Sequence, residues 1–328
     1  MPSKVLIRRA DPAAPLTAVR ELMEGCAWRE LIAPQAAVVI KPNLCTERIE
    51  QIHTANTSAT VLRAVCQVLL EQTANITIVE SNGARYPAEA AFENNGVYRL
   101  AEELGLKVVN LSKDELLEIP DARMKGFGMA RTWLEADAFI TLPVLKTHAT
   151  TVFTGALKNQ WGCIPRYDRI LLHKYLHELI GDVNILRPPT FALMDGLVGM
   201  QGRGPINGYQ INLNVLLASR DPVALDATGM RLIGLEPPTS QHLVHAARIG
   251  LGTLLEDEIQ VDGPFEQLRT RVEPAAEDWA IKVMNKLSRS QFLTKNLLLN
   301  DGIFYPIRRA VNAVRGLLKA GKRAVAGY

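Results

Sequence analysis

The chain has 328 residues, of which 48% are hydrophobic and 22% charged, and this composition is typical of a globular protein rather than a disordered one. The sequence contains neither the roughly eighteen consecutive apolar residues of a membrane span nor a signal peptide at its start, so we expect a cytoplasmic protein. The four cysteines are widely spaced and include no C-x-x-C pair, which excludes a local zinc or iron-sulfur motif.

The net charge of +3 is unevenly distributed along the chain. Residues 281–328 hold ten lysines and arginines against one acidic residue, so this segment carries about +9 and the remainder about −6. Within it, apolar residues recur at helical spacing and basic residues fall largely on other faces. The apolar positions are Ile307, Val311, Val314 and Leu318, and the basic ones are Arg308, Arg315, Lys319, Lys322 and Arg323. This pattern predicts a basic amphipathic helix that docks on an anionic membrane surface, a nucleic acid, a second subunit or the acidic body of the chain.

Short β-branched runs alternate with helical patterns along the rest of the chain. We expect strands over 4–9, 36–43, 75–81, 107–111, 138–148, 191–196 and 213–219, and helices near 16–23, 59–70, 98–104, 151–160, 170–180 and 221–234. In the last of these helices, Asp221 is the expected N-cap and Pro222 occupies the first turn. The alternation predicts an α/β domain over residues 1–265 with a mainly parallel sheet and flanking helices, followed by a helical extension over 266–328.

Polar clusters begin where four of these apolar strands stop. The clusters are Lys41-Pro42-Asn43, Glu80-Ser81-Asn82-Gly83, Lys146-Thr147-His148 and Asp195-Gly196. In parallel α/β sheets, ligands bind outside the carboxyl ends of the strands, so we expect these clusters to share one crevice.

Three lysines adjoin apolar or glycine-containing sequence in VVIKPN, LPVLKTH and TGALKN, namely Lys41, Lys146 and Lys158. This setting predicts partly buried ammonium groups that need an anion or a covalent partner. A carboxylate or phosphate ligand would satisfy them, as would salt bridges to Asp195 or Asp226. Asn43 and Asn159 adjoin two of these lysines and are further candidates for substrate binding.

Histidines supply candidates for proton transfer and for metal binding. His148 lies two residues beyond Lys146, and His173 and His177 are spaced i, i+4 on a predicted helix, which would place both on one face. One interpretation is that His148 or His173 acts as a general acid or base, while Asp195 orients a lysine or histidine. A metal bound by His148, His173 and His177 is another, although spacing alone fixes no carboxylate as a further ligand.

Neither a dinucleotide fingerprint nor a phosphate-binding P-loop follows any strand, so the sequence indicates no cofactor of these kinds. The glycine-rich run GMQGRGPING at 199–208 leads into a strand rather than a helix. We expect it to form a turn or a flap over the crevice, with Arg203 as an anion contact.

Several motifs in order resemble one family of bacterial and archaeal proteins. They are K-P-N at 41–43, K-T-H at 146–148, T-G-A-L-K-N at 154–159, D-G-x-x-G-M-x-G-x-G-P at 195–205 and D-P-V-A-L-D at 221–226. They resemble the family called domain of unknown function 362, over roughly residues 1–265. Some members of that family carry an appended ferredoxin-like domain with clustered cysteines, which this chain lacks.

A second, more distant resemblance is to the nickel-pincer lactate racemases. His148, the segment Thr154 to Lys158 that ends in a lysine, and His173 are similar in order and spacing to their site. Where those racemases have a G-x-H-R-type histidine, however, this chain reads Asn82-Gly83-Ala84-Arg85. The resemblance therefore implies a shared fold and site location and does not imply nickel.

Two classes of function fit these patterns. The first is an enzyme of the oxidoreductase or isomerase type that acts on a small anionic substrate. Its catalytic residues would be His148, Lys158, His173 and Asp195, and its substrate-binding residues Lys41, Asn43, Lys146, Asn159 and Arg203. The second is a non-catalytic module that binds an anion, a metabolite or a nucleic acid and docks through its basic tail, which would make the protein peripheral at a membrane.

Overall fold

The structure is a computed structural model that describes residues 2–275 and 279–325, without the side chains of residues 281, 312 and 315–325. It divides into two compact units, residues 1–167 with 175–276, and residues 168–174 with 277–328. The first unit, called the body below, is an α/β domain built on a ten-stranded sheet. Its backbone reaches past residue 265, because Thr270 N donates to Leu232 O at 2.8 Å and Gly202 N to Glu273 O at 2.8 Å.

Eight strands of the sheet run in the order β12-β1-β11-β10-β7-β2-β3-β4, and β8 pairs with β10 and β9. The bounds are β1 Ser3–Arg9, β2 Val38–Pro42, β3 Ile76–Glu80, β4 Lys107–Asn110, β7 Ala138–Leu142, β8 Val144–His148, β9 Val152–Phe153, β10 Phe191–Gln201, β11 Tyr209–Ser219 and β12 Ile259–Asp262. A separate small pair joins β5 (Leu116–Leu117) to β6 (Met129–Ala130). The pairs from β10 to β4 are parallel, whereas β11 is antiparallel to both β1 and β10, so the sheet is mixed but mainly parallel.

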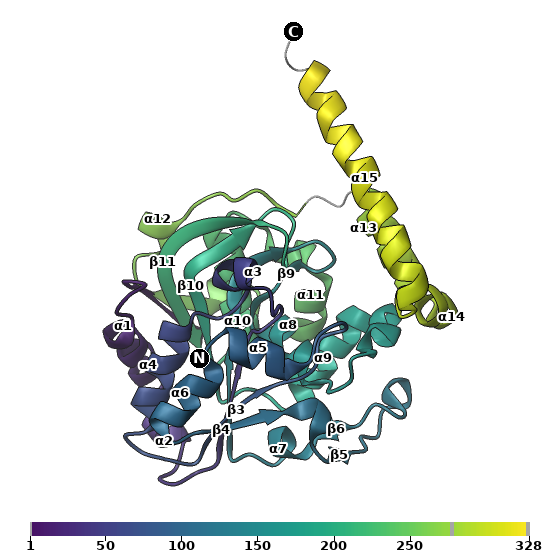
Figure 1. Cartoon of the computed structure of the whole chain (residues 1–328). Coiled ribbons are helices and arrows are strands. Elements are labelled where there is room, and N and C mark those ends of the chain that lie inside the picture. Colours follow the sequence, from purple (N-terminus) through teal and green to yellow (C-terminus); the bar gives the residue numbers. More distant parts are fainter. Residues whose placement is uncertain (1, 276–278, 326–328) are drawn as a thin grey trace. The chain divides into compact units, whose positions relative to one another are not determined.

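Helices flank this sheet, as the sequence predicts (Figure 1). Those of the body are α1 Leu16–Gly25, α2 Trp28–Leu31, α3 Ile49–Ala55, α4 Ala59–Leu69, α5 Ala88–Asn94, α6 Val97–Leu104, α7 Arg131–Leu134, α8 Gly155–Asn159, α9 Leu176–Leu186, α10 Pro222–Leu232, α11 Gln241–Arg248 and α12 Phe265–Leu268. The expected cap of α10 is confirmed, because Asp221 Oδ1 accepts the N–H groups of Val223 and Ala224.

The period of two along a strand sorts its side chains between the faces of the sheet. In β2, Val38 and Ile40 belong to the apolar core that also contains the buried faces of α1 and α4. Lys41 is next to Ile40 and therefore points to the opposite face, where α8 lies against the sheet. The same alternation that places Val38 and Ile40 in the core therefore places Lys41 on the opposite face of the sheet.

Two expected helices and two expected strand ends are wrong. Residues 151–160 form the short strand β9 and the five-residue α8, because Gly155 takes a left-handed φ of +59°. Residues 169–175 form a 3₁₀ segment and α9 begins only at Leu176.

The run 138–148 is divided by Pro143 into β7 and β8. Asp195 lies within β10 and not at its end, because β10 continues beside β11 through a register shift at Gly196.

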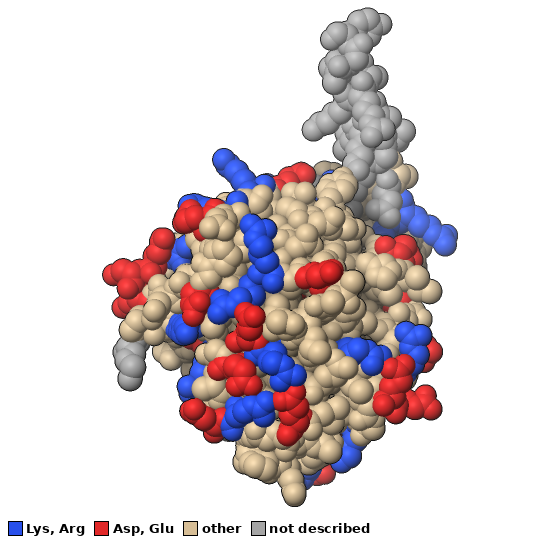
Figure 2. Space-filling model, turned by 90° about the vertical axis from the view of Figure 1, so that its left-hand side faces the viewer, with Lys and Arg blue, Asp and Glu red and all other residues tan. Residues whose placement is uncertain are grey.

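The face of the body that carries α1, α4 and α6 has both signs of charge intermixed (Figure 2). Exposed ion pairs such as Arg8 with Glu21 and Arg20 with Glu71 account for part of this pattern. Nucleic acids bind surfaces with a field of one sign, so this face gives no support to a nucleic-acid partner.

The second unit is helical in its described residues. It contains α13 (Trp279–Ser288), α14 (Gln291–Leu293), a π-helical turn (Thr294–Leu298) and α15 (Asp301–Val325). The predicted C-terminal helix is therefore present, but Arg315, Leu318, Lys319, Lys322 and Arg323 lie outside the described side chains. Among the described residues, no helix has both the length and the apolar character that crossing a membrane requires.

Candidate functional site

The chain reverses its direction of travel across the sheet between β2 and β7. From β2 it proceeds to β3 and β4 on one side, and from β7 it proceeds to β10 on the other. Such a topological switch point is where open α/β sheets bind ligands, outside the carboxyl ends of the strands. Lys41 and Asn43 come at the end of β2, directly at this place.

Lys41 forms a buried ion pair with Glu80 at the end of the neighbouring strand β3. Its Nζ donates to Glu80 Oε2 at 2.7 Å, to Pro42 O at 3.0 Å and to Asn159 Oδ1 at 3.3 Å. The two side chains are 1% and 6% exposed. All three ammonium protons therefore have acceptors inside the protein, and the anion that the sequence led us to expect beside Lys41 is Glu80.

Asn159 ties α8 to the sheet beside this pair. Its Nδ2 donates to Thr141 Oγ1 at 2.8 Å and to Lys41 O at 3.2 Å, while its Oδ1 accepts from Asn43 Nδ2 at 3.0 Å. Asn159 thus contacts both Lys41 and Asn43 directly, so the structure brings these three residues together.

Lys146 continues the network on the other side of Asn43. Its side chain is fully buried, and Nζ lies 2.7 Å from Asn43 Oδ1, 2.5 Å from Ala55 O and 3.1 Å from Cys45 Sγ. Burial lowers the pKa of Lys146, and the charge of Lys41 lowers it further, whereas Cys45 and Glu80 act in the opposite direction. None of the three contacts is a carboxylate, so Lys146 differs from Lys41 in having no ion-pair partner within hydrogen-bond distance among the described residues.

The network holds the loop between β2 and α4 in place. Thr57 Oγ1 accepts from Asn43 N at 2.8 Å and donates to Leu142 O at 2.6 Å. Asn56 Oδ1 accepts from Cys45 N at 2.9 Å. Asn56 and Thr57 line a pocket of about 590 Å³, so the buried network fixes part of the pocket wall.

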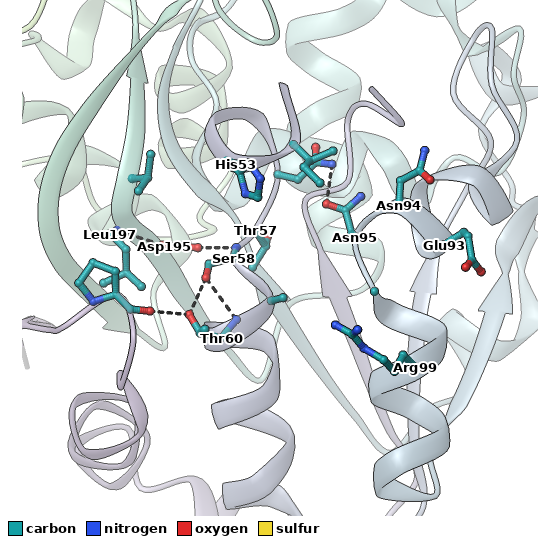
Figure 3. A pocket seen from close by; sticks show the side chains of 16 residues that line it. His53, Thr57, Ser58, Thr60, Glu93, Asn94, Asn95, Arg99, Asp195 and Leu197 are labelled. Atoms are coloured by element: carbon teal, nitrogen blue, oxygen red, sulfur yellow. Dashed lines mark hydrogen bonds between the residues drawn. The ribbon is translucent and has the colours of Figure 1, made fainter. Parts of the chain in front are cut away.

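Asp195 lines the same pocket from β10 (Figure 3). It is 2% exposed, and its oxygens accept from Ser58 N at 2.7 Å and Leu197 N at 3.0 Å. Burial raises the pKa of Asp195 to about 6, against the opposing effect of these two hydrogen bonds. The expectation that Asp195 orients a lysine or histidine is wrong, because its hydrogen-bond donors are backbone amides.

Further groups surround the pocket. The first turn of α4 contributes Ser58 and Thr60, and Figure 3 shows Arg99, His53 and Glu93 on other parts of the wall. The N-terminal turn of a helix and an arginine both favour an anion. Sequence reasoning missed Arg99 and His53, since neither lies next to a strand end.

The turn between β10 and β11 covers the outer end of β8. Thr147 Oγ1 donates to Gly202 O at 2.9 Å and Ala149 N to Gly204 O at 3.1 Å. A Cβ at Gly204 would lie 1.8 Å from Thr147 O, so the close approach requires glycine. Arg203 lies in this turn. His148 follows Thr147 at the end of β8, and its Nδ1 accepts from Thr150 N at 3.0 Å and Thr151 N at 3.2 Å. In its neutral form His148 therefore carries its proton on Nε2.

A family model with the description "Domain of unknown function (DUF362)" matches residues 38–231. The chain belongs to the family of domain of unknown function 362. The match runs from β2 to α10 and so contains the whole buried network of this family member.

The chain is also similar to a protein named thylakoid-associated protein sll1697, from Synechocystis sp. strain PCC 6803. The two sequences are 26% identical over 244 residues, which is 72% of this chain and 75% of the relative. The aligned length covers most of both proteins.

In this DUF362 protein, Lys158 lies in the last turn of α8, and Asp226 of α10 binds the first turn of α8. Asp226 accepts from Ala156 N at 2.6 Å and Leu157 N at 3.0 Å, and Lys158 Nζ lies 5.8 Å from the centre of the Trp161 ring. The alternative that Lys41 and Lys146 form salt bridges to Asp195 or Asp226 is wrong, since both carboxylates bind backbone amides instead.

The pairing of His173 with His177 on one helical face is also wrong. His173 lies in the 3₁₀ segment and in the second unit, whereas His177 belongs to α9 of the body. The ring of His177 stacks on that of His242, with centroids 6.3 Å apart. The described part of the chain contains no group of three His, Cys, Asp or Glu side chains that could hold a metal. That His173 joins the crevice stays a prediction.

Proposed function

We propose that this DUF362 protein is an enzyme that acts on a small anionic substrate, a carboxylate or phosphate, in the pocket beside the topological switch point. The observation that carries the proposal is Asp195, an almost fully buried carboxyl group in the wall of a pocket of about 590 Å³. A pKa raised to about 6 suits Asp195 to giving and taking protons near neutral pH.

The proposed reaction is of the isomerase or oxidoreductase type on a hydroxy or keto acid. An isomerase moves a proton at or beside the carbon next to the carboxylate, whereas an oxidoreductase moves a hydride between that carbon and an acceptor and a proton at the oxygen bound to it. In both, Asp195 is the residue proposed to move the proton. Arg99 and the first turn of α4 would hold the negative charge. Lys41 and Lys146, which the sequence suggested as direct ligands, are proposed to act by positioning the loop that lines the pocket.

Incubation with lactate or pyruvate in D₂O tests the isomerase form of the proposal, because removal of a proton from carbon exchanges a carbon-bound hydrogen that NMR detects. We expect exchange above the protein-free rate, lost in Asp195→Asn and weakened at low substrate concentration in Arg99→Ala. Arg63→Ala is the matched control, since Arg63 lies on the outer face of α4 and pairs with Glu103. Exchange that persists unchanged in Asp195→Asn would contradict the assignment of the proton carrier.

A second proposed property is peripheral association with an anionic membrane through the helical unit. The exposed face of α15 includes Ile303, Ile307 and Val314, which are 38%, 50% and 44% exposed and follow helical spacing. The described side chains of residues 279–325 include six basic groups and one acidic group: Lys282, Lys286, Arg289, Lys295, Arg308, Arg309 and Asp301. Apolar and basic groups on one helical unit fit an anionic lipid surface, and the similar protein of Synechocystis is named for its association with thylakoids.

Flotation with vesicles that contain anionic lipid tests this association at two salt concentrations. We expect the full chain to float at low salt and less at high salt, and a chain that lacks residues 281–328 not to float. Ile307→Ser should weaken flotation, whereas Leu255→Ser, at an exposed apolar residue of the body, should not. Equal flotation of both chains would instead favour packing against a second subunit or the body.

A further inference from the structure

The helices α9 and α11 begin next to each other, and each has a histidine in its first turn. These are His177 in α9 and His242 in α11. Their rings stack with centroids 6.3 Å apart and planes at 18°. The short helix α8, whose last turn carries Lys158, packs against both helices. Lys158, His177 and His242 are called the histidine site below, and none of them lines the pocket that contains Asp195.

The electrostatics of the histidine site favour an anion. The amino end of a helix carries a partial positive charge, and no side chain of the described residues caps the amino end of α9 or of α11. Lys158 adds a full positive charge that acts on the pKa of His242, whereas no carboxylate of the described residues acts on it. Glu178, the acidic residue in the first turn of α9, is exposed. An anion beside Lys158 would therefore be stabilised by one full and two partial positive charges.

His242 is a neutral ring with a defined tautomer. Burial lowers its pKa to about 3, and the charges of His177 and Lys158 act in the same direction. Ser240 Oγ donates to Thr151 O at 3.4 Å and lies 3.0 Å from Nδ1 of His242. Because the carbonyl of Thr151 uses the single hydroxyl proton of Ser240, Nδ1 of His242 carries the ring proton and donates to Oγ. Nε2 of His242 is therefore a hydrogen-bond acceptor.

This acceptor is buried and lacks a donor. His242 is 1% exposed, and its Nε2 has no hydrogen-bond partner in the described part of the chain. A buried acceptor without a donor costs free energy, so native proteins supply one from a side chain, a water molecule or a ligand. Lys158 and His177 are only half-buried, so the site is in contact with solvent. The histidine site thus combines a place for negative charge with an acceptor that needs a donor.

We propose that the histidine site binds a small 2-hydroxy acid, outside the pocket that contains Asp195. The carboxylate of this ligand lies beside Lys158 and the amino ends of α9 and α11, and its hydroxyl group donates to Nε2 of His242. The two groups are on adjacent carbons in such an acid, so one small molecule presents both. An acid without the hydroxyl would match the charge alone, and a neutral alcohol would match the acceptor alone.

An NMR titration of protein labelled with nitrogen-15 in its histidines tests the proposal. Lactate is the probe, and propionate, which lacks the hydroxyl, is the comparison. We expect lactate to move the Nε2 signal of His242 and to bind about tenfold more tightly than propionate, because only lactate offers a donor. An unchanged signal would show that water alone satisfies Nε2, and equal affinities would show that the hydroxyl is not recognised. Either result would overturn the proposal.

The signal of His242 is identified by its loss in His242→Gln. If that variant does not fold, His242 is the histidine whose signal does not titrate down to pH 5, because its pKa is about 3.

Charge variants separate this site from the Asp195 pocket. Lys158→Met should weaken the binding of lactate at His242 about tenfold. Lys107→Met, at an exposed position in β4, is the matched control and should not change it. Asp195→Asn should keep the shift of the His242 signal. Loss of the shift in Asp195→Asn, or unchanged binding in Lys158→Met, would contradict the proposal. An intact shift without hydrogen exchange would instead refute the proposed enzyme activity alone.

Discussion

The carboxylate of Glu80 and the ammonium of Lys41 meet at the carboxyl ends of two adjacent parallel strands. Oε2 and Nζ are 2.7 Å apart, and the side chains are almost fully buried. Glu80 Oε2 also accepts from Leu44 N at 3.2 Å, and Oε1 from Ser81 N at 2.9 Å. The pair therefore neutralises the buried charge at the switch point. Its hydrogen bond from Leu44 N also holds the start of the loop that leads to the pocket.

Glu80→Gln should destabilise the fold by about 3–5 kcal/mol, because it leaves the Lys41 ammonium buried without its counter-charge. Urea unfolding measures this loss. Glu115→Gln is the matched control at the exposed pair with Arg131 and should change stability little. The double variant Lys41→Met with Glu80→Gln should recover part of the loss. A loss in Glu80→Gln no larger than in the control would show that the pair contributes little.

Gly162→Ala should cost about 1–3 kcal/mol, because an added Cβ would lie 2.8 Å from Lys41 Cε and 2.9 Å from Glu80 Oε1. Both side chains are held by several hydrogen bonds and have little freedom to move aside. Thermal unfolding measures the effect, with Gly302→Ala in α15 as the control, where the nearest atom is the side-chain oxygen of Asn300 at 3.3 Å. Equal melting temperatures for Gly162→Ala and wild type would mean that the pair shifts freely.

Stability should fall as the pH is lowered from about 6.5 towards 3, because of His242. Burial lowers the pKa of His242 to about 3, with smaller contributions from His177 and Lys158, whereas an unfolded histidine titrates near 6.5. Between these values the unfolded chain binds more protons than the folded one, so the free energy of unfolding rises with pH by up to about 1.4 kcal/mol per unit. His242 contributes this stability fully above 6.5.

Urea unfolding at pH 7 and pH 5 measures this slope. His242→Gln should flatten it, and His53→Gln, at an exposed histidine of the pocket wall, should not. Nδ1 of His242 lies 3.0 Å from Ser240 Oγ, a contact that a glutamine can replace in part. An unchanged slope in His242→Gln would assign the acid sensitivity to other groups.

Lys158→Ala should remove exchange of lactate hydrogen while leaving the melting temperature within a few degrees of wild type. Lys158 is half-buried at the last turn of α8, where its side chain contributes charge rather than core volume. Lys107→Ala is the control, at an exposed position in β4. A large loss of stability with unchanged exchange would reveal a structural lysine.

Local sequence patterns were sufficient to predict much of the fold. The strands over 38–42, 76–80 and 107–110, the helix after Asp221 and the long C-terminal helix all follow from periodicity and capping within short windows. The helix expected over 170–180 failed although its apolar spacing was regular, because tertiary packing decided where α9 begins. His173 and His177 were separated as a result.

For the candidate site too, the sequence determined one part and the tertiary structure decided the rest. The sequence by itself determined which lysines and asparagines come to the carboxyl edge, because strand direction and the end of each apolar run are local properties. It did not determine their partners: Lys41 binds Glu80, 39 residues away, and Lys146 lies against Ala55 O, 91 residues away. Only the tertiary structure decided that one lysine is neutralised and the other faces a thiol, since Coulomb energy and desolvation depend on which distant segments the fold brings within a few ångströms.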